Sequence, residues 1–142
     1  MIKQISVFYP LLGQVGITFA VWLWMYKTRL SEIKKMAVRP AEIATDQALT
    51  AKLKNVVAPS DNFKNLFEVP VLFYVLSLSL YVTHQVDTLF LVLMWLFVVT
   101  RAVHSLIHST NNNVIPRFIS YVTSSGILWL CWLLFAIALL SE

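Results

Sequence analysis

The sequence predicts an all-α integral membrane protein, a bundle of four transmembrane helices. Of its 142 residues, 58% are hydrophobic and only 13% are charged, and the mean hydropathy is +0.73. Soluble domains carry about 25% charged residues, whereas a chain in lipid must present apolar side chains. Long apolar runs of about the 20 residues that a spanning helix needs recur along the chain. We therefore expect a single membrane domain over residues 1–142.

The first predicted span covers about residues 5–26. Lys3 in front of it would also suit a signal peptide. The apolar run is too long for that, however, and no cleavage site of small residues follows it. Lys27 and Arg29 resemble a stop-transfer flank instead, so we interpret this segment as a membrane helix.

Three further spans follow, and two of them carry a charge inside the membrane. The second span covers about residues 63–83 and contains Glu68. The third covers 88–109 and contains Arg101, and the fourth covers 117–140, with its only charge at its start. Charged side chains are costly inside a bilayer, so these residues are the first candidates for function.

The distribution of positive charge predicts the orientation. Loop 27–62 is the only long one, and loop 110–116 is neutral but is followed directly by Arg117. Positive loops stay inside, so both loops are predicted to be cytoplasmic and both termini to lie on the opposite side. Short loops and bare termini favour a bacterial inner membrane. This topology explains the net charge of +4 without nucleic-acid binding. The basic residues of the long loop are Lys27, Arg29, Lys34, Lys35, Arg39, Lys52 and Lys54.

Segment 45–57 of the long loop admits two interpretations. The spacing of Leu49, Leu53 and Val56 suits a short amphipathic helix. The alternative, which we favour, is an extension of the second span beyond the membrane.

Polar residues on two of the spans are placed to face one another. Asn65 and Glu68 are three residues apart, and Arg101, His104 and His108 occupy one face of the third span. Glu68 and Arg101 each lie on the order of 7–12 Å below the cytoplasmic surface, at 1.5 Å per helical residue. An ion pair between them is feasible, and it could serve only to fasten the bundle.

An ion pair that only fastens the bundle would not need further polar residues near it, yet the two histidines, Asn65 and Arg117 all lie near the same surface. Together they predict a polar, cation-rich cavity open to the cytoplasm, whose ligand would be an anion. His104 and His108 also have the spacing of two metal ligands. Arg101 and Arg117 would repel a metal cation, and no cysteine or second carboxylate joins the histidines, so we predict no metal.

Three motifs, in this order, resemble the MAPEG superfamily, the membrane-associated proteins of eicosanoid and glutathione metabolism. Residues 64–68, KNLFE, resemble its Asn-x-x-Glu signature, and residues 101–108, RAVHSLIH, resemble its Arg-x-x-His-x-x-x-Tyr motif. Arg117 stands sixteen residues after Arg101, as in the prostaglandin-synthase-type and microsomal glutathione transferase branches of the family. Tyr121 falls where some members have an aromatic residue. The likeness is good from Asp61 to the C-terminus and is limited to topology before it.

The resemblance implies a homotrimer that holds glutathione between neighbouring subunits, near the cytoplasmic face. Lipophilic substrates would arrive from the bilayer. Arg117 would lie beside the glutathione sulfur as the catalytic residue, where its charge lowers the thiol pKa from about 8.5. The remaining glutathione pocket would be formed by Asn65, Glu68, Arg101, His104, His108 and Tyr121.

The sequence departs from the family pattern at four positions. Asp61 stands where many members have an arginine, and His108 replaces the tyrosine at the end of the third span. Phe118 replaces a serine of one branch, and Pro70 lies closer to the Asn-x-x-Glu signature than in eukaryotic members.

Two functional classes follow. The first is a glutathione-dependent transferase or peroxidase that acts on lipophilic electrophiles or lipid hydroperoxides. The second is a non-catalytic membrane protein that binds lipids or a partner protein, as one branch of the family does. A membrane enzyme or transporter with another ligand stays open. Arg117, Asn65 and Glu68 favour the first class, whereas Asp61 and His108 favour the others.

Overall fold

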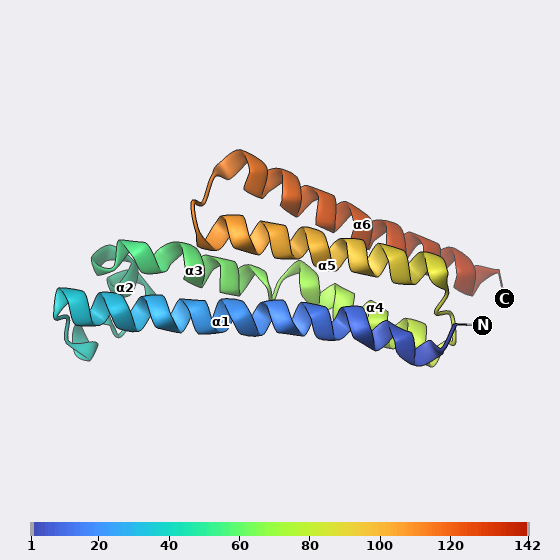
Figure 1. Cartoon of the computed structure of the whole chain (residues 1–142), viewed down its shortest axis with the longest axis horizontal. Coiled ribbons are helices and arrows are strands. Elements are labelled where there is room, and N and C mark those ends of the chain that lie inside the picture. The colour runs from blue at the N-terminus through green and yellow to red at the C-terminus, as the bar shows by residue number, and fades with distance from the viewer. Residues whose placement is uncertain (1, 142) are drawn as a thin grey trace.

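The computed structural model describes residues 2–141 and confirms the predicted fold class, a four-helix transmembrane bundle (Figure 1). Residues 37–53 lie at one end of the bundle, and the turn 110–113 lies in the same half but closer to the middle; we call this half the loop end (Figure 1). Both termini lie at the other end. Within the described residues, four helical stretches are long and apolar enough to cross a membrane: Gln4–Met36, Lys54–Val82, Thr88–Ser109 and Val114–Leu140.

The first stretch combines a 3-10 turn, η1 (Gln4–Val7), with helix α1 (Phe8–Met36). Helix α1 therefore continues past Tyr26, where the predicted span ends. At the opposite end, the Gln4 amide donates from Nε2 to the Val86 carbonyl at 3.3 Å and accepts from the Val86 N–H at 3.0 Å. These two bonds satisfy backbone groups of the turn before α5, where the chain has no helical partner for them.

The predicted loop is largely helical. After η2 (Pro40–Ile43) come α2 (Asp46–Lys52) and α3 (Lys54–Asn65). Both interpretations of residues 45–57 are therefore partly right, because α2 is a separate short helix and α3 extends the second span. Thr45 begins α2 by accepting a hydrogen bond from the Ala48 N–H at 3.2 Å, a capping role that threonine fills well.

A small apolar cluster attaches these helices to the end of α1. Leu49, Leu53 and Val56 are buried and pack against Ile33 and Ile43, among others. The predicted apolar spacing thus faces α1. On the exposed side, Lys52 and Arg39 pair with Glu42, and the hydrogen bond and charge of Lys52, more than those of Arg39, lower the pKa of the Glu42 carboxyl.

A break separates α3 from α4 (Val69–Val82), near the middle of the bundle (Figure 1). Pro70 stands at the start of α4 and has no N–H to bond the carbonyl of Leu66, against which its ring would also clash in a continuous helix. Glu68, between the two helices, has φ −98° and ψ −105°, outside the helical region. The second span is therefore two helices rather than the single helix that the sequence suggested.

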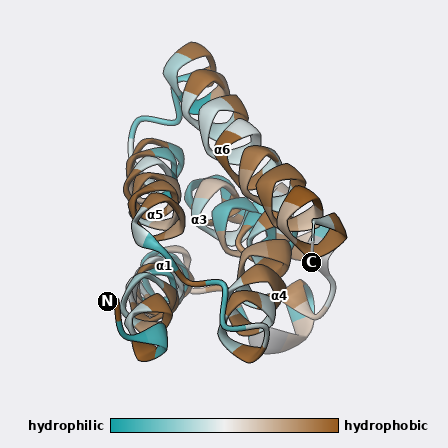
Figure 2. Ribbon diagram, turned by 90° about the vertical axis from the view of Figure 1, so that its right-hand side faces the viewer, coloured by the Kyte–Doolittle hydropathy of each residue, from teal (hydrophilic) through white to brown (hydrophobic). Residues whose placement is uncertain are grey.

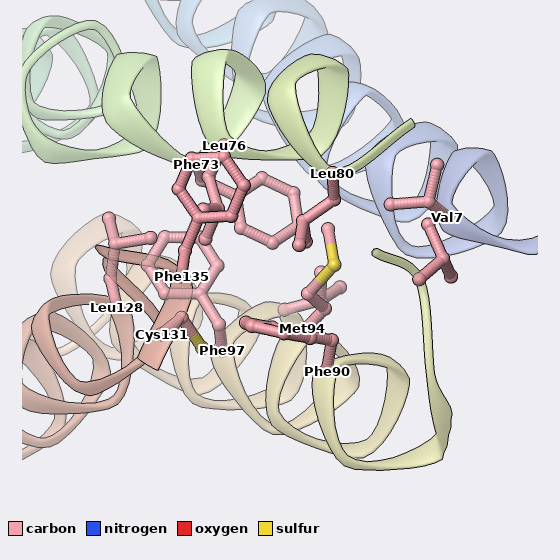
Figure 3. Packing of buried hydrophobic residues seen from close by; sticks show 12 residues of the cluster. Val7, Phe73, Leu76, Leu80, Phe90, Met94, Phe97, Leu128, Cys131 and Phe135 are labelled. Carbon is pink, nitrogen blue, oxygen red and sulfur yellow. The ribbon is translucent and has the colours of Figure 1, made fainter. Parts of the chain in front are cut away.

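Helices α5 (Thr88–Ser109) and α6 (Val114–Leu140) form an antiparallel pair. Asp87 caps α5 by accepting from the Phe90 N–H at 2.8 Å. The apolar core lies toward the terminal end, between α4, α5 and α6 (Figure 3). At its centre Phe73 and Phe97 stack with ring centroids 4.5 Å apart.

The outward faces of the bundle are apolar. Hydrophobic residues run along α4, α5 and α6, while hydrophilic ones gather on α3 (Figure 2). Large side chains such as Leu106, Trp129 and Leu133 are more than two-fifths exposed. In water such a surface would aggregate, whereas lipid solvates it.

We expect Phe73→Ala to destabilise the bundle by on the order of 2 kcal/mol. The cost should fall below that of a comparable cavity in a soluble core, because lipid solvates the exposed side chain in the unfolded state. The measurement is reversible unfolding in mixed micelles titrated with SDS. Val75→Ala, which changes a 45% exposed residue of the same helix, is the control and should be nearly neutral. Equal losses in the two variants would contradict the assigned core.

Candidate functional site

A fully buried arginine organises the loop end of the bundle. Arg101 on α5 has no exposed surface, and its Nη2 donates to the Asn65 side-chain Oδ1 at 2.6 Å and to the Asn65 carbonyl at 3.3 Å. Asn65 in turn donates from Nδ2 to the Glu68 carboxylate at 2.9 Å. Among the described residues no Glu68–Arg101 ion pair forms. The Asn65 side chain lies between the two charged groups and bonds to both. We call this chain of hydrogen bonds, from Arg101 through Asn65 to Glu68, the relay.

The helix break makes this relay possible. Asn65 is the last residue of α3, and its carbonyl lies where a continuous helix would use it for the Val69 N–H. At the break this carbonyl turns to other donors, including Arg101. A carbonyl and an amide oxygen together suit a guanidinium, which has several donors and no acceptor.

Tyr121 covers the other side of Arg101. The Cζ of Arg101 lies 5.7 Å from the centroid of the Tyr121 ring, within the range of a cation–π interaction. The same ring lies 5.7 Å from the His104 ring. Tyr121 therefore separates Arg101 from the pocket that lies above it.

That pocket has a volume of about 260 Å³ and opens at the loop end between α3, α5 and α6. No carboxylate lines it, so its polar lining offers amide, imidazole, phenol and guanidinium groups. An anion is the ligand that such a lining favours. The lining residues are Asn65, His104, His108, Val114, Arg117, Phe118 and Tyr121.

Arg117, in the first turns of α6, is held at two points. Its carbonyl lies 3.0 Å from His104 Nδ1. Because a carbonyl only accepts, Nδ1 carries the proton, and Nε2 of a neutral His104 is an acceptor. The Arg117 guanidinium donates from Nη1 to the side chain of Asn112, in the preceding turn. Backbone and guanidinium are thus both fixed from α5 and its turn.

Asn112 adopts a left-handed backbone conformation, with φ 49°. Asparagine tolerates this region better than most residues. Its N–H donates to the Ile107 carbonyl at 2.8 Å, which closes the end of α5. The turn that ends α5 therefore also aims an acceptor at Arg117.

The structure divides the predicted site residues into two groups. Asn65, His104, His108, Arg117 and Tyr121 line the pocket together. Arg101 lies buried beneath it, and Glu68 lies on the far side of Asn65. Neither charged residue of the predicted ion pair is part of the pocket surface.

Two contributors escaped the sequence analysis. Asn62 is fully buried and donates from Nδ2 to the Ser105 carbonyl at 3.2 Å and the Ser109 hydroxyl at 2.8 Å, which ties α3 to α5. It lies one helical turn before Asn65, and a systematic search for polar residues near span two would have found it. Asn112 gave no such signal, because its role depends on the fold of a turn.

The spacing of His104 and His108 would suit two metal ligands. Within residues 2–141 no three His, Cys, Asp or Glu side chains come close enough to hold an ion. His104 and His108 contact each other edge to face, with ring centroids 5.5 Å apart.

Comparison with known proteins gives one match. The family model described as MAPEG family matches residues 7–137, nearly the whole chain. No curated protein and no solved structure matches.

The relay predicts a ranking of two substitutions. Asn65→Leu should lower the free energy of unfolding by about 2–3 kcal/mol, because it removes the one polar side chain that, among the described residues, bonds to the buried guanidinium. Glu68→Gln should cost less than about 1 kcal/mol, because Glu68 is exposed and the new amide oxygen can still accept from Asn65. SDS-titrated unfolding measures both. A larger loss in Glu68→Gln would show that the carboxylate, not the amide, holds Arg101.

Proposed function

The chain belongs to the MAPEG family, and on that premise we propose that it is a membrane glutathione-dependent transferase or peroxidase. Its second substrates are lipophilic electrophiles or lipid hydroperoxides that enter from the bilayer. One observation carries the proposal: the Arg117 guanidinium, fixed by Asn112, lines a pocket without carboxylates.

In this proposal Arg117 stabilises the glutathione thiolate. A guanidinium beside a thiol favours the ionised form and lowers the thiol pKa. The position of Arg117 in the first turns of α6 adds the partial positive charge of a helix N-terminus. Arginine cannot act as a general base at neutral pH, so its role is electrostatic and the thiol proton leaves to the solvent.

Two reactions then become available to the thiolate. It attacks an electrophilic carbon, forming a carbon–sulfur bond while the leaving group departs with its electron pair. Alternatively it attacks a hydroperoxide, whose oxygen–oxygen bond breaks to give an alcohol and a sulfenic acid. A second glutathione condenses with the sulfenic acid to a disulfide and water.

A homotrimer would complete the pocket. The volume of about 260 Å³ is small for a tripeptide, since sites for ligands of that class usually measure about 300–1,000 Å³. The pocket lies at the outer surface of α6, with the exposed Val114 and Phe118 at its edge. A neighbouring subunit would enlarge it and supply cations for the glutathione carboxylates, for which Arg29 and Lys64 are candidates. We propose that this end faces the cytoplasm of a bacterial cell.

One observation favours the second candidate function, a non-catalytic MAPEG protein that binds a lipid or a protein partner. Asp61 interacts electrostatically with His108, a lining residue. A negative charge that interacts with a lining residue opposes the binding of the glutathione carboxylates. If this repulsion prevents glutathione from binding, the pocket holds a less acidic ligand.

The direct test is calorimetric titration of the detergent-purified protein with glutathione, with thiolate absorbance followed against pH. We expect a thiol pKa below the ordinary value of about 8.5. Arg117→Ala should return it to that value and abolish conjugation while leaving the oligomer intact. Lys35→Ala, which removes an exposed cation remote from the pocket, is the control. No binding at several millimolar would favour the second candidate, and unchanged turnover in Arg117→Ala would refute the assigned role.

Asn112 should act on the thiol through Arg117. Asn112→Gly keeps the left-handed turn but removes the oxygen that holds the guanidinium. We expect the thiol pKa to rise by part of the Arg117→Ala shift, with little change in glutathione affinity. Asn112→Asp should raise it further, because a carboxylate neutralises the guanidinium. Thiolate absorbance against pH measures both, with Asn111→Ala as the neighbouring control. An unmoved pH profile in both Asn112 variants would contradict the positioning role.

A further inference from the structure

A second concave feature lies between α1 and α5, on a different face of α5 from the pocket. We call it the α1–α5 groove; it measures about 410 Å³. Its walls include Ile17, Val21 and Trp24 from α1, and Ala102 and Leu106 from α5. The small side chains of Ala20 and Ala102 form its floor where bulkier residues would fill it. None of its lining residues is titratable, so the groove itself offers no acid–base chemistry.

The groove runs from the loop end toward the middle of the bundle. Trp24 and Ser109 lie at its outer end, where the Trp24 indole donates to the Ser109 carbonyl at 3.3 Å. Ile17 and Ala102 lie about 10 Å deeper, at 1.5 Å per helical residue. Tryptophan is typical of the membrane–water interface. The outer end therefore lies at headgroup depth and the inner end among acyl chains.

A cation stands at the outer end. Lys27 Nζ lies over the Trp24 ring, 5.4 Å from its centroid. Among the described residues no carboxylate pairs with Lys27, since both ion pairs of that part involve Glu42. The groove thus combines an apolar channel with an uncompensated positive charge at the depth of lipid phosphates.

We propose that the α1–α5 groove is a binding site for an anionic phospholipid. One acyl chain lies between α1 and α5 along Ala20 and Ala102, and the phosphate pairs with Lys27. Basic residues at this depth attract anionic headgroups. Each methylene of the acyl chain that enters the groove gains dispersion contacts with its walls. This site is independent of the proposed reaction, because it uses neither Arg117 nor its pocket.

Native mass spectrometry of the detergent-solubilised protein, titrated with phosphatidylglycerol, tests the proposal. We expect Lys27→Gln to weaken binding about fivefold, the effect of one cation near an anionic surface. Ala102→Phe and, from the facing wall, Ala20→Phe should weaken it about tenfold, equivalent to excluding roughly two methylenes. The matched controls are Lys35→Gln, an equal loss of charge on the same helix, and Ala136→Phe, an equal gain of bulk on α6. Both should bind as the parent does.

Four results would overturn the proposal. Equal weakening by Lys35→Gln would mean that net charge, not the groove, attracts the lipid. Unchanged binding in both phenylalanine variants would mean that no acyl chain occupies the groove. A change in subunit number in those variants, read in the same spectra, would assign the groove to a second copy of the chain. Phosphatidylcholine should bind more weakly than phosphatidylglycerol, and equal binding would also contradict the role of Lys27.

Discussion

Burial of the Arg101 charge is the constraint on which the loop end of this bundle depends. A guanidinium without exposed surface in an apolar bundle is costly unless its donors and charge find partners. The chain meets part of this need with a helix break, which Pro70 enforces and which turns the Asn65 carbonyl and amide toward Nη2 of Arg101. Nε and Nη1 have no hydrogen-bond partner among the described residues. The Tyr121 ring then packs against the guanidinium. The helix break, the Asn65 hydrogen bonds and the Tyr121 ring thus all surround the same buried charge.

The relay also determines the sign of charge in the pocket. A direct ion pair would have brought the Glu68 carboxylate next to Arg101 and closer to the pocket. With Asn65 between them, Glu68 stays outside, and the lining keeps only neutral and basic groups. Arg117 is then the one permanent charge on the pocket surface, and no acidic lining residue neutralises it. An anion or a thiolate entering there meets an uncompensated cation at a helix N-terminus.

Much of the architecture could be predicted from the sequence, because the bilayer imposes length and apolarity on every span. The predicted third span, 88–109, has the same bounds as α5, where Asp87 provides a local capping signal. The second span was harder. The sequence showed Asn65 and Glu68 three residues apart, as on one helix face, but Pro70 moved them into different elements. The polar residues of the site could be identified, whereas their order, with the amide between the charges, depends on the angle at a break.

The two arginines show why residue type alone could not assign roles. Both lie in the same half of the bundle, and both belong to motifs that carry the family resemblance. Arg101 is fully buried, with Nη2 bonded to Asn65 and the guanidinium next to the Tyr121 ring, so a ligand cannot touch it without displacing its neighbours. Arg117 stands at a helix start, with its backbone held by His104 and its guanidinium by Asn112. Burial makes the first a structural charge, and position at the pocket edge leaves the second free to act on a ligand.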